Sequence, residues 1–122
     1  MQSRALGSLL LLLVGAVAQA QRPTKIFISV DMEGISGVVD PAQLGPDGFE
    51  YQRAREWMTG EVNAAITAIR AAGPAEIVVC DSHGNGQSVL IDKLPDDVRI
   101  VRADQCDDEC RKPRDFCLRT DG

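Results

Sequence analysis

The sequence predicts an α/β fold with a parallel β-sheet of the three-layer type, built around a β-α-β unit. Two short, nearly continuous apolar runs have the length and β-branched composition of strands that are buried on both faces. Between them lies a longer segment with apolar residues at helical spacing. The order strand, helix, strand favours parallel strands joined by a right-handed crossover.

The first strand is expected at Lys25–Val30, which reads KIFISV. Residues 31–50 are rich in Gly, Asp and Pro, so we expect a loop there. Residues 51–72 carry apolar side chains at three- and four-residue steps, which predicts an amphipathic helix. Gly60 weakens this helix by about 1 kcal/mol relative to alanine, and the glycine-proline pair that follows residue 72 ends it.

The second strand is expected at Glu76–Cys80 (EIVVC), with Cys80 as a small buried core residue. A polar, glycine-rich loop follows at residues 82–86. Residues 98–101 (VRIV) form a possible third strand after a turn at Pro95.

Residues 1–20 have the pattern of a cleaved export signal. Arg4 supplies a positive charge, an apolar run follows at residues 9–14, and Ala18 and Ala20 form a small-x-small cleavage site. The apolar run is shorter than the roughly 20 residues that span a bilayer. We therefore expect an exported protein, periplasmic or secreted, with no membrane contact after cleavage. An uncleaved anchor or a buried N-terminal helix is the alternative.

Composition excludes several classes of function. The chain has a net charge of −5 and no cluster of Lys or Arg, which argues against nucleic acid and anionic membranes as partners. Its single histidine excludes three-histidine sites and the H-E-x-x-H motif, and no G-x-S-x-G motif is present. The spacing of the four cysteines matches no common structural zinc pattern.

Four ionisable side chains follow the two strands of the predicted unit. Asp31 and Glu33 come after the first strand, and Asp81 and His83 come after the second. Parallel strands about 4.8 Å apart end at the same edge of a sheet, where ligands of open α/β sheets bind. Carboxylates and imidazole are typical ligands of catalytic zinc, and carboxylates can bridge two ions. The sequence therefore predicts metal ligation by Asp31, Glu33 and His83, with Asp81 orienting the loop that carries His83.

Each of these residues also has a simpler interpretation when it is taken alone. Asp31 is of a type that often caps a helix or forms a turn, Glu33 could be a solvated loop residue, and His83 could be structural. Gly84 and Gly86, after a strand, could cradle a phosphate, although two glycines alone are weak evidence.

Three motifs resemble those of the zinc-dependent D-aminopeptidases, the family of the dipeptide-operon D-aminopeptidase. They are S-V-D-M-E-G-I-S-G-V-V at residues 29–39, M-T-G-E-V-N-A-A-I at residues 58–66 and D-S-H-G at residues 81–84. Their order is that of the family, and the resemblance extends from Lys25 to about Arg102. It implies that these elements are the N-terminal portion of a larger α/β domain.

The resemblance also implies chemistry. It implies a two-zinc peptidase that removes N-terminal D-residues, notably D-alanine, from short peptides, and that assembles into a ring-shaped homodecamer. Asp31 would bridge the two zinc ions, while Glu33 and His83 would complete parts of the two ligand sets. The family's further histidine and glutamate ligands and its cysteine nucleophile would fall beyond Gly122. The expectation is therefore a truncated, inactive fragment that contains no catalytic nucleophile.

The expected organisation has three parts. They are a signal peptide at residues 1–20, the N-terminal part of a D-aminopeptidase-like domain at residues 21–103, and a divergent tail at residues 104–122. More than half of the tail residues are charged, so we expect disorder there. The alternative from another functional class is an exported, noncatalytic metal- or peptide-binding module.

Overall fold

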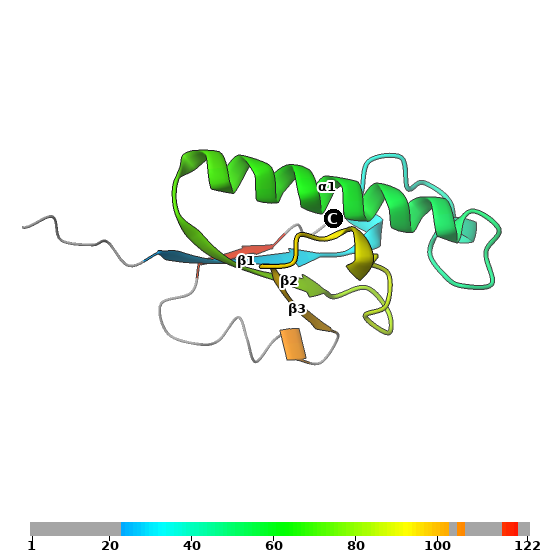
Figure 1. The fold of residues 1–122 in the computed structure, drawn as a ribbon. Coiled ribbons are helices and arrows are strands. Elements are labelled where there is room, and N and C mark those ends of the chain that lie inside the picture. Colours follow the sequence, from blue (N-terminus) through cyan, green and yellow to red (C-terminus); the bar gives the residue numbers. More distant parts are fainter. Residues whose placement is uncertain (1–22, 103–104, 107–115, 120–122) are drawn as a thin grey trace, which may run out of the picture.

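The computed structural model describes residues 23–102, 105–106 and 116–119 of the 122-residue chain. Its elements are strands, short 3-10 helices and the long helix α1 (Figure 1). In chain order they are β1 (Thr24–Val30), η1 (Met32–Gly34), η2 (Pro41–Gln43), α1 (Tyr51–Ala72), β2 (Ala75–Asp81), η3 (Ile91–Lys93), β3 (Arg99–Arg102) and β4 (Phe116–Arg119).

The strands form one parallel sheet in the order β3-β2-β1-β4. The predicted α/β class, parallel pairing and β-α-β unit are therefore confirmed. The helix has the predicted bounds, and the possible third strand is present one residue further along the chain. Helix α1 continues through Gly60, whose α-carbon faces open space.

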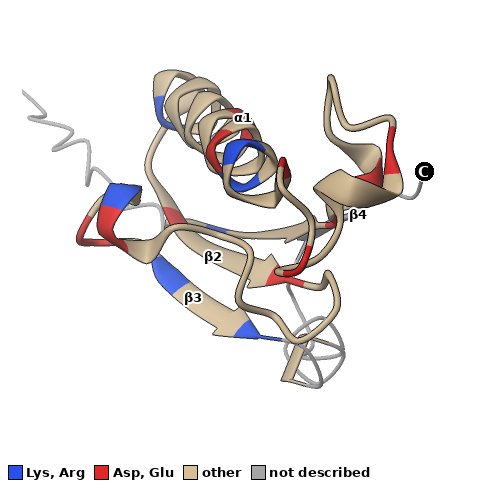
Figure 2. Ribbon diagram, turned by 90° about the vertical axis from the view of Figure 1, so that its right-hand side faces the viewer, with Lys and Arg blue, Asp and Glu red and all other residues tan. Residues whose placement is uncertain are grey.

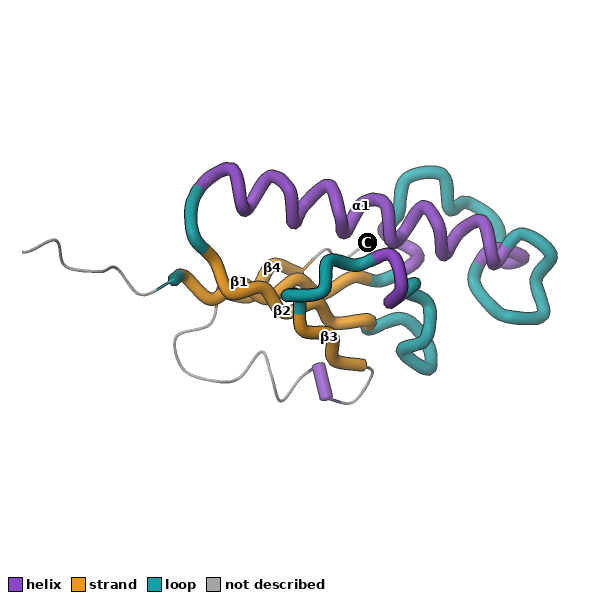
Figure 3. The backbone as a smooth tube through the Cα atoms, in the orientation of Figure 1, coloured by secondary structure: helices purple, strands orange, loops and turns teal. Residues whose placement is uncertain are grey.

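Helix α1 covers one face of the sheet (Figures 1 and 3). Side chains alternate across a strand, so every second residue of β1 and β2 faces the helix. The residues that pack together in this layer are buried: Ile28 and Val30 of β1, Ile77 and Val79 of β2, and Ala54, Met58, Val62 and Ile66 of α1. This core fixes the position of the helix over the two central strands.

The intervening strand residues form a second cluster on the opposite face. Phe27, Val78, Cys80 and Val101 are buried there together with Cys106. Cys80, predicted as a buried core residue, is fully buried and forms a disulfide with Cys106, with the two α-carbons 5.5 Å apart. The disulfide ties the end of β2 to the segment that follows β3.

Strands β1 and β2 pair in register from Thr24 opposite Ala75 to Val30 opposite Asp81. The two strands consequently end level with each other. The segments that follow them, which carry the predicted site residues, start at the same edge of the sheet.

Two predicted segments lie at the ends of the chain. The signal peptide at residues 1–20 lies outside the described residues. The disorder expected for residues 104–122 is wrong for Phe116–Arg119, which pair as β4 with Ile26–Ser29 of β1. The reason is that strand pairing satisfies backbone N–H and C=O groups at the edge of a sheet, and composition does not report this interaction. Within the described parts of the chain, no helix is long and apolar enough to cross a membrane.

The disulfide is expected to contribute measurably to stability. It closes a loop with a sequence separation of 26, for which chain entropy gives roughly 3–4 kcal/mol. Urea unfolding followed by circular dichroism should show a loss of this order when a reductant is added. The variant Cys106→Ser should have the lower free energy of unfolding even without reductant, and adding reductant should not change it. Equal unfolding midpoints for the wild-type chain with and without reductant would contradict this expectation.

Candidate metal centre

Asp31 and Glu33 are placed by the turn that directly follows β1. Between them, Met32 is fully buried in the core and anchors the turn η1. Because neighbouring side chains point in different directions, the anchoring of Met32 leaves the two carboxylates on the outer side. Both side chains follow the C-terminal end of β1 and are about half exposed. Figure 2 shows acidic residues beyond the strand ends.

His83 reaches the same edge from the loop that follows β2. Its Nδ1 atom lies 3.0 Å from Asp31 Oδ1 and 2.8 Å from Glu33 Oε2. The potential ligand atoms of the three residues all lie within 4.8 Å of one another. The structure thus brings together the three side chains that the strand order predicted, although His83 is about 50 residues from the two carboxylates in sequence.

The second ring nitrogen of His83 has a separate partner. Nε2 lies 2.7 Å from the carbonyl oxygen of Leu44. A carbonyl can only accept, so Nε2 donates its hydrogen and Nδ1 is left facing the two carboxylates. Metal-binding histidines are commonly held in this way by a carbonyl or carboxylate on the far nitrogen. The donor set therefore fits a divalent cation among Nδ1 and the two carboxylates.

Electrostatics at the cluster favour a positive charge on or near the imidazole. Burial acts to lower the pKa of His83, but the hydrogen bonds with Leu44, Asp31 and Glu33 outweigh it and raise the pKa above the ordinary value. Burial acts to raise the pKa of Asp31, but hydrogen bonds with Glu33 and His83 and the charge of His83 outweigh it and lower the pKa. The two carboxylates therefore favour a positive charge beside them, which either a proton on His83 or a metal ion would supply.

Asp81, the last residue of β2, makes different contacts from the other three side chains. It is fully buried, and its Oδ2 atom accepts hydrogen bonds from the backbone N–H groups of Ser88 (2.6 Å) and Val89 (2.7 Å). Thr59 Oγ1 of α1 accepts from the N–H of Leu90 at 3.0 Å. These contacts hold the far end of the loop that carries His83. That Asp81 thereby orients His83 for a metal ion stays a prediction.

Arg55 of α1 holds the same loop from outside. Its Nε donates to the carbonyl of Ser88 and its Nη2 to the carbonyl of Gln87, both at 3.0 Å. Tyr51 contributes a hydroxyl contact of 3.1 Å to the Ser88 hydroxyl. The first turns of α1 therefore clamp the His83 loop. Within that loop Gly84 has a φ of +53°, a left-handed conformation that favours glycine directly after the histidine.

Sequence reasoning missed several of these groups. The Leu44 contact involves a backbone carbonyl, which leaves no trace in the side-chain pattern. Arg55 and Thr59 read as ordinary residues of an amphipathic helix. One signal was available: Asp40-Pro41-Ala42-Gln43 has the spacing of a capping box, and the structure contains that capping box. It would have located η2 within the predicted loop.

The raised pKa of His83 can be measured directly because it is the chain's only histidine. In metal-free protein, NMR titration of its ring protons should give a pKa above the ordinary value of 6.5. Protonated His83 then stabilises the fold below pH 6.5, and this contribution is lost as the pH rises through the raised pKa. Glu33→Gln should lower the pKa, whereas Glu76→Gln, at the start of β2, should not. A pKa at or below 6.5 in the wild-type chain would contradict the geometry.

The clamp by Arg55 can be tested against its neighbour Arg53, which instead lies over the ring of Trp57 at 4.8 Å. Arg55→Ala removes both donors to the His83 loop, so the ring should leave the carboxylates and its pKa should fall toward the ordinary value. Arg53→Ala removes an equal charge from the same helix and should leave the His83 titration nearly unchanged. Identical titrations for the two variants would show that the clamp does not position His83.

Comparisons with known proteins identify the family of this chain. The profile of the D-aminopeptidase family, peptidase family M55, matches residues 24–109, six residues beyond the boundary expected at residue 103. A D-aminopeptidase of Bacillus subtilis (strain 168) is 35% identical over 80 residues, which are 66% of this chain and 29% of the relative.

A solved structure shows the same relationship in three dimensions. The Zn-dependent D-aminopeptidase DppA from Bacillus subtilis, described as a self-compartmentalizing protease, superimposes with a TM-score of 0.62 at 35% identity. The match covers 66% of this chain and 29% of that one, so the chain spans well under half the length of its relatives. The family profile covers most of the chain, and its match includes the cluster of Asp31, Glu33 and His83. The chain therefore belongs to the D-aminopeptidase family of peptidases.

Proposed function

We propose that this chain supplies part of the metal centre of a zinc-dependent aminopeptidase. The observation that carries the proposal is the orientation of His83. Its Nε2 atom is occupied by Leu44, and its Nδ1 atom faces the carboxylates of Asp31 and Glu33 at 3.0 and 2.8 Å. Membership of the D-aminopeptidase family and the zinc dependence of DppA support the same assignment.

Asp31, Glu33 and His83 would hold the zinc. Asp31 would serve both ions, as the resemblance of residues 29–39 to the family motif implies, and its ligand atom lies within 4.8 Å of those of Glu33 and His83. Zinc would supply Lewis acidity, which polarises a peptide carbonyl and lowers the pKa of water. A two-ion hydrolytic site needs more donors than these three side chains, so we propose that they form a portion of it. Residues 1–122 alone would then bind zinc without appreciable turnover.

The proposed substrates are short peptides with an N-terminal D-residue. The resemblance to the family implies D-alanine as that residue. The self-compartmentalizing character of DppA supports assembly of the whole protein into a closed homo-oligomer. The export signal proposed at residues 1–20 would place this peptidase outside the cytoplasm, with access to D-amino-acid peptides there.

Zinc calorimetry tests the ligand assignment. Asp31→Asn keeps the shape of the side chain and removes its charge, and it should weaken zinc binding more than Glu33→Gln does, because a bridging carboxylate serves both ions. Losses of at least about 10-fold are expected for a direct ligand. Asp47→Asn, which removes a carboxylate outside the cluster, is the matched control. Affinity that stays at the wild-type level in both Asp31→Asn and His83→Ala would place the site elsewhere and reject the proposal.

A further inference from the structure

The stretch between η1 and α1 connects two parts of the metal centre. It begins after the turn that carries Asp31 and Glu33, and it includes Leu44, whose carbonyl accepts from Nε2 of His83 at 2.7 Å. The position of that carbonyl decides which ring nitrogen faces the carboxylates. The contacts that hold Leu44 in place therefore bear on the chemistry of the site.

Gln43, the residue before Leu44, is the buried centre of this stretch. It is only 3% exposed. Its Oε1 atom accepts from the N–H groups of Val39 (2.6 Å) and Asp40 (2.8 Å), and its Nε2 atom donates to the carbonyl of Gly37 at 3.1 Å. One side chain thus binds three backbone groups and uses both the oxygen and the nitrogen of its amide.

Asp40 binds Gln43 in return. The Asp40 side chain accepts from the backbone N–H of Gln43, so the two residues form the capping box of η2. The N–H of Leu44 donates to the carbonyl of Pro41, the first residue of η2, at 3.1 Å. Leu44 is therefore held by η2 on its N–H side, while its carbonyl accepts from His83.

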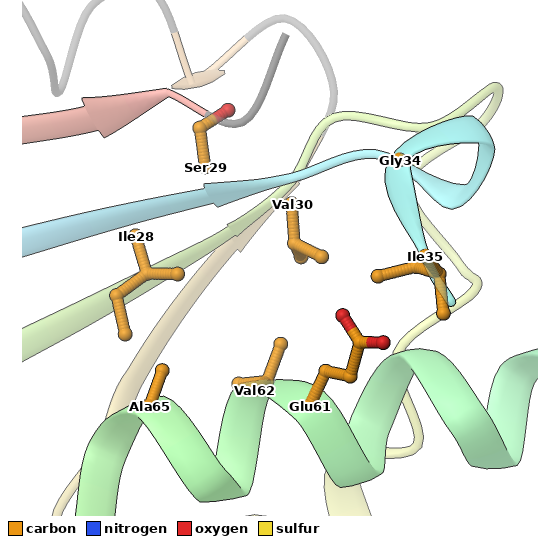
Figure 4. A pocket seen from close by; sticks show the side chains of 8 residues that line it. All are labelled: Ile28, Ser29, Val30, Gly34, Ile35, Glu61, Val62 and Ala65. Atoms are coloured by element: carbon orange, nitrogen blue, oxygen red, sulfur yellow. The ribbon is translucent and has the colours of Figure 1, made fainter. Parts of the chain in front are cut away.

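The same stretch is fastened to helix α1. In Figure 4 the carboxylate of Glu61, at the hollow between β1 and α1, points toward the turn at Ile35, and it accepts from the N–H of Ser36 at 2.9 Å. Gly37 follows directly and lies against α1, since a β-carbon added there would be 3.4 Å from the ring of Trp57. Gln43 therefore connects Leu44 to a part of the chain that α1 holds.

The two sides of the His83 ring compete for one hydrogen. A neutral imidazole carries a single N–H, and both of its nitrogens face acceptors in this structure. The two carboxylates favour the hydrogen on Nδ1, whereas the Leu44 carbonyl favours it on Nε2. Only an acceptor that is held firmly at Nε2 keeps Nδ1 free to bind a cation.

We propose that Gln43 is a positioning residue of the metal centre. Through the capping box it holds the Leu44 carbonyl at Nε2 of His83, and the lone pair of Nδ1 is thereby left for the metal ion. Gln43 acts through Leu44 and contributes no ligand of its own. The inference rests on the proposed function, because Nδ1 is the atom that would bind zinc.

The variant Gln43→Met tests this role, because it nearly keeps the volume of the side chain and removes all three backbone contacts. The imidazole nitrogens are observed by NMR in isotopically labelled, metal-free protein, at a pH at which His83 is neutral. The hydrogen should lie on Nε2 in the wild-type chain and move toward Nδ1 in Gln43→Met. Zinc affinity, measured by calorimetry, should fall by roughly 10-fold, the lower end of the range for groups that support a metal ligand.

Two further variants separate positioning from stability. Gln43→Glu can still accept from the same two backbone N–H groups, as the glutamate of a capping box does, so it should keep the hydrogen of His83 on Nε2. Ile66→Val removes a methyl group from the core beneath α1. It should lower the free energy of unfolding without moving the imidazole hydrogen.

The inference is rejected if Gln43→Met keeps the hydrogen on Nε2 or binds zinc as tightly as the wild type. It is also rejected if Gln43→Glu or Ile66→Val moves the hydrogen as far as Gln43→Met does. Should Gln43→Met fail to fold, Asp40→Ala decides, because it opens the capping box from its exposed end. The hydrogen should then move toward Nδ1 in Asp40→Ala, and a hydrogen that stays on Nε2 rejects the inference.

The metal-free spectra keep this inference separate from the proposed function. Absence of zinc binding to the wild-type chain rejects the proposed function, and the position of the imidazole hydrogen then decides the role of Gln43 alone. Normal zinc binding with an unmoved hydrogen in Gln43→Met rejects the role of Gln43 and leaves the metal assignment intact.

Discussion

His83 has two ring nitrogens, and the carbonyl of Leu44 occupies one of them. The chemistry of the site follows from that hydrogen bond. Because Nε2 donates its hydrogen to Leu44, Nδ1 is directed at Asp31 and Glu33. An ionised carboxylate has no hydrogen to donate to Nδ1. A positive charge, on the ring or between the three side chains, satisfies this arrangement. The Leu44 carbonyl, directly after η2, therefore orients the imidazole.

Buried contacts beside the sheet hold the segments that carry the exposed side chains of the metal centre. In-register pairing of β1 and β2 brings the two site segments to one edge of the sheet. Below that edge, the buried carboxylate of Asp81 binds two backbone N–H groups of the His83 loop, and Arg55 binds two of its carbonyls. Oδ1 of Asp81 is buried without a hydrogen-bond partner among the described residues. A carboxylate is costly to bury, and the two hydrogen bonds that Oδ2 accepts from Ser88 and Val89 offset part of that cost.

Much of this arrangement could be predicted from sequence, for identifiable reasons. The helical period of residues 51–72 and the β-branched runs at residues 25–30 and 76–80 are strong local patterns, and parallel pairing follows from their order. The two predicted strands end at the same edge of the sheet, so they were sufficient to predict that Asp31, Glu33 and His83 lie close together. The Leu44 contact, the Arg55 clamp and the disulfide of Cys80 with Cys106 depend on how distant segments meet. Strand β4 was missed because its sequence is short and its neighbours are charged, while its pairing with β1 uses backbone groups that any sequence supplies.

In the proposed metal centre, His83 presents Nδ1, and no other nitrogen, to a cation held with Asp31 and Glu33. NMR of the imidazole nitrogens in isotopically labelled protein, recorded before and after addition of zinc, tests it most directly. We expect zinc to coordinate Nδ1 while Nε2 keeps its hydrogen, still bonded to the Leu44 carbonyl. Coordination through Nε2, or an imidazole spectrum unaffected by saturating zinc, would rule out this arrangement.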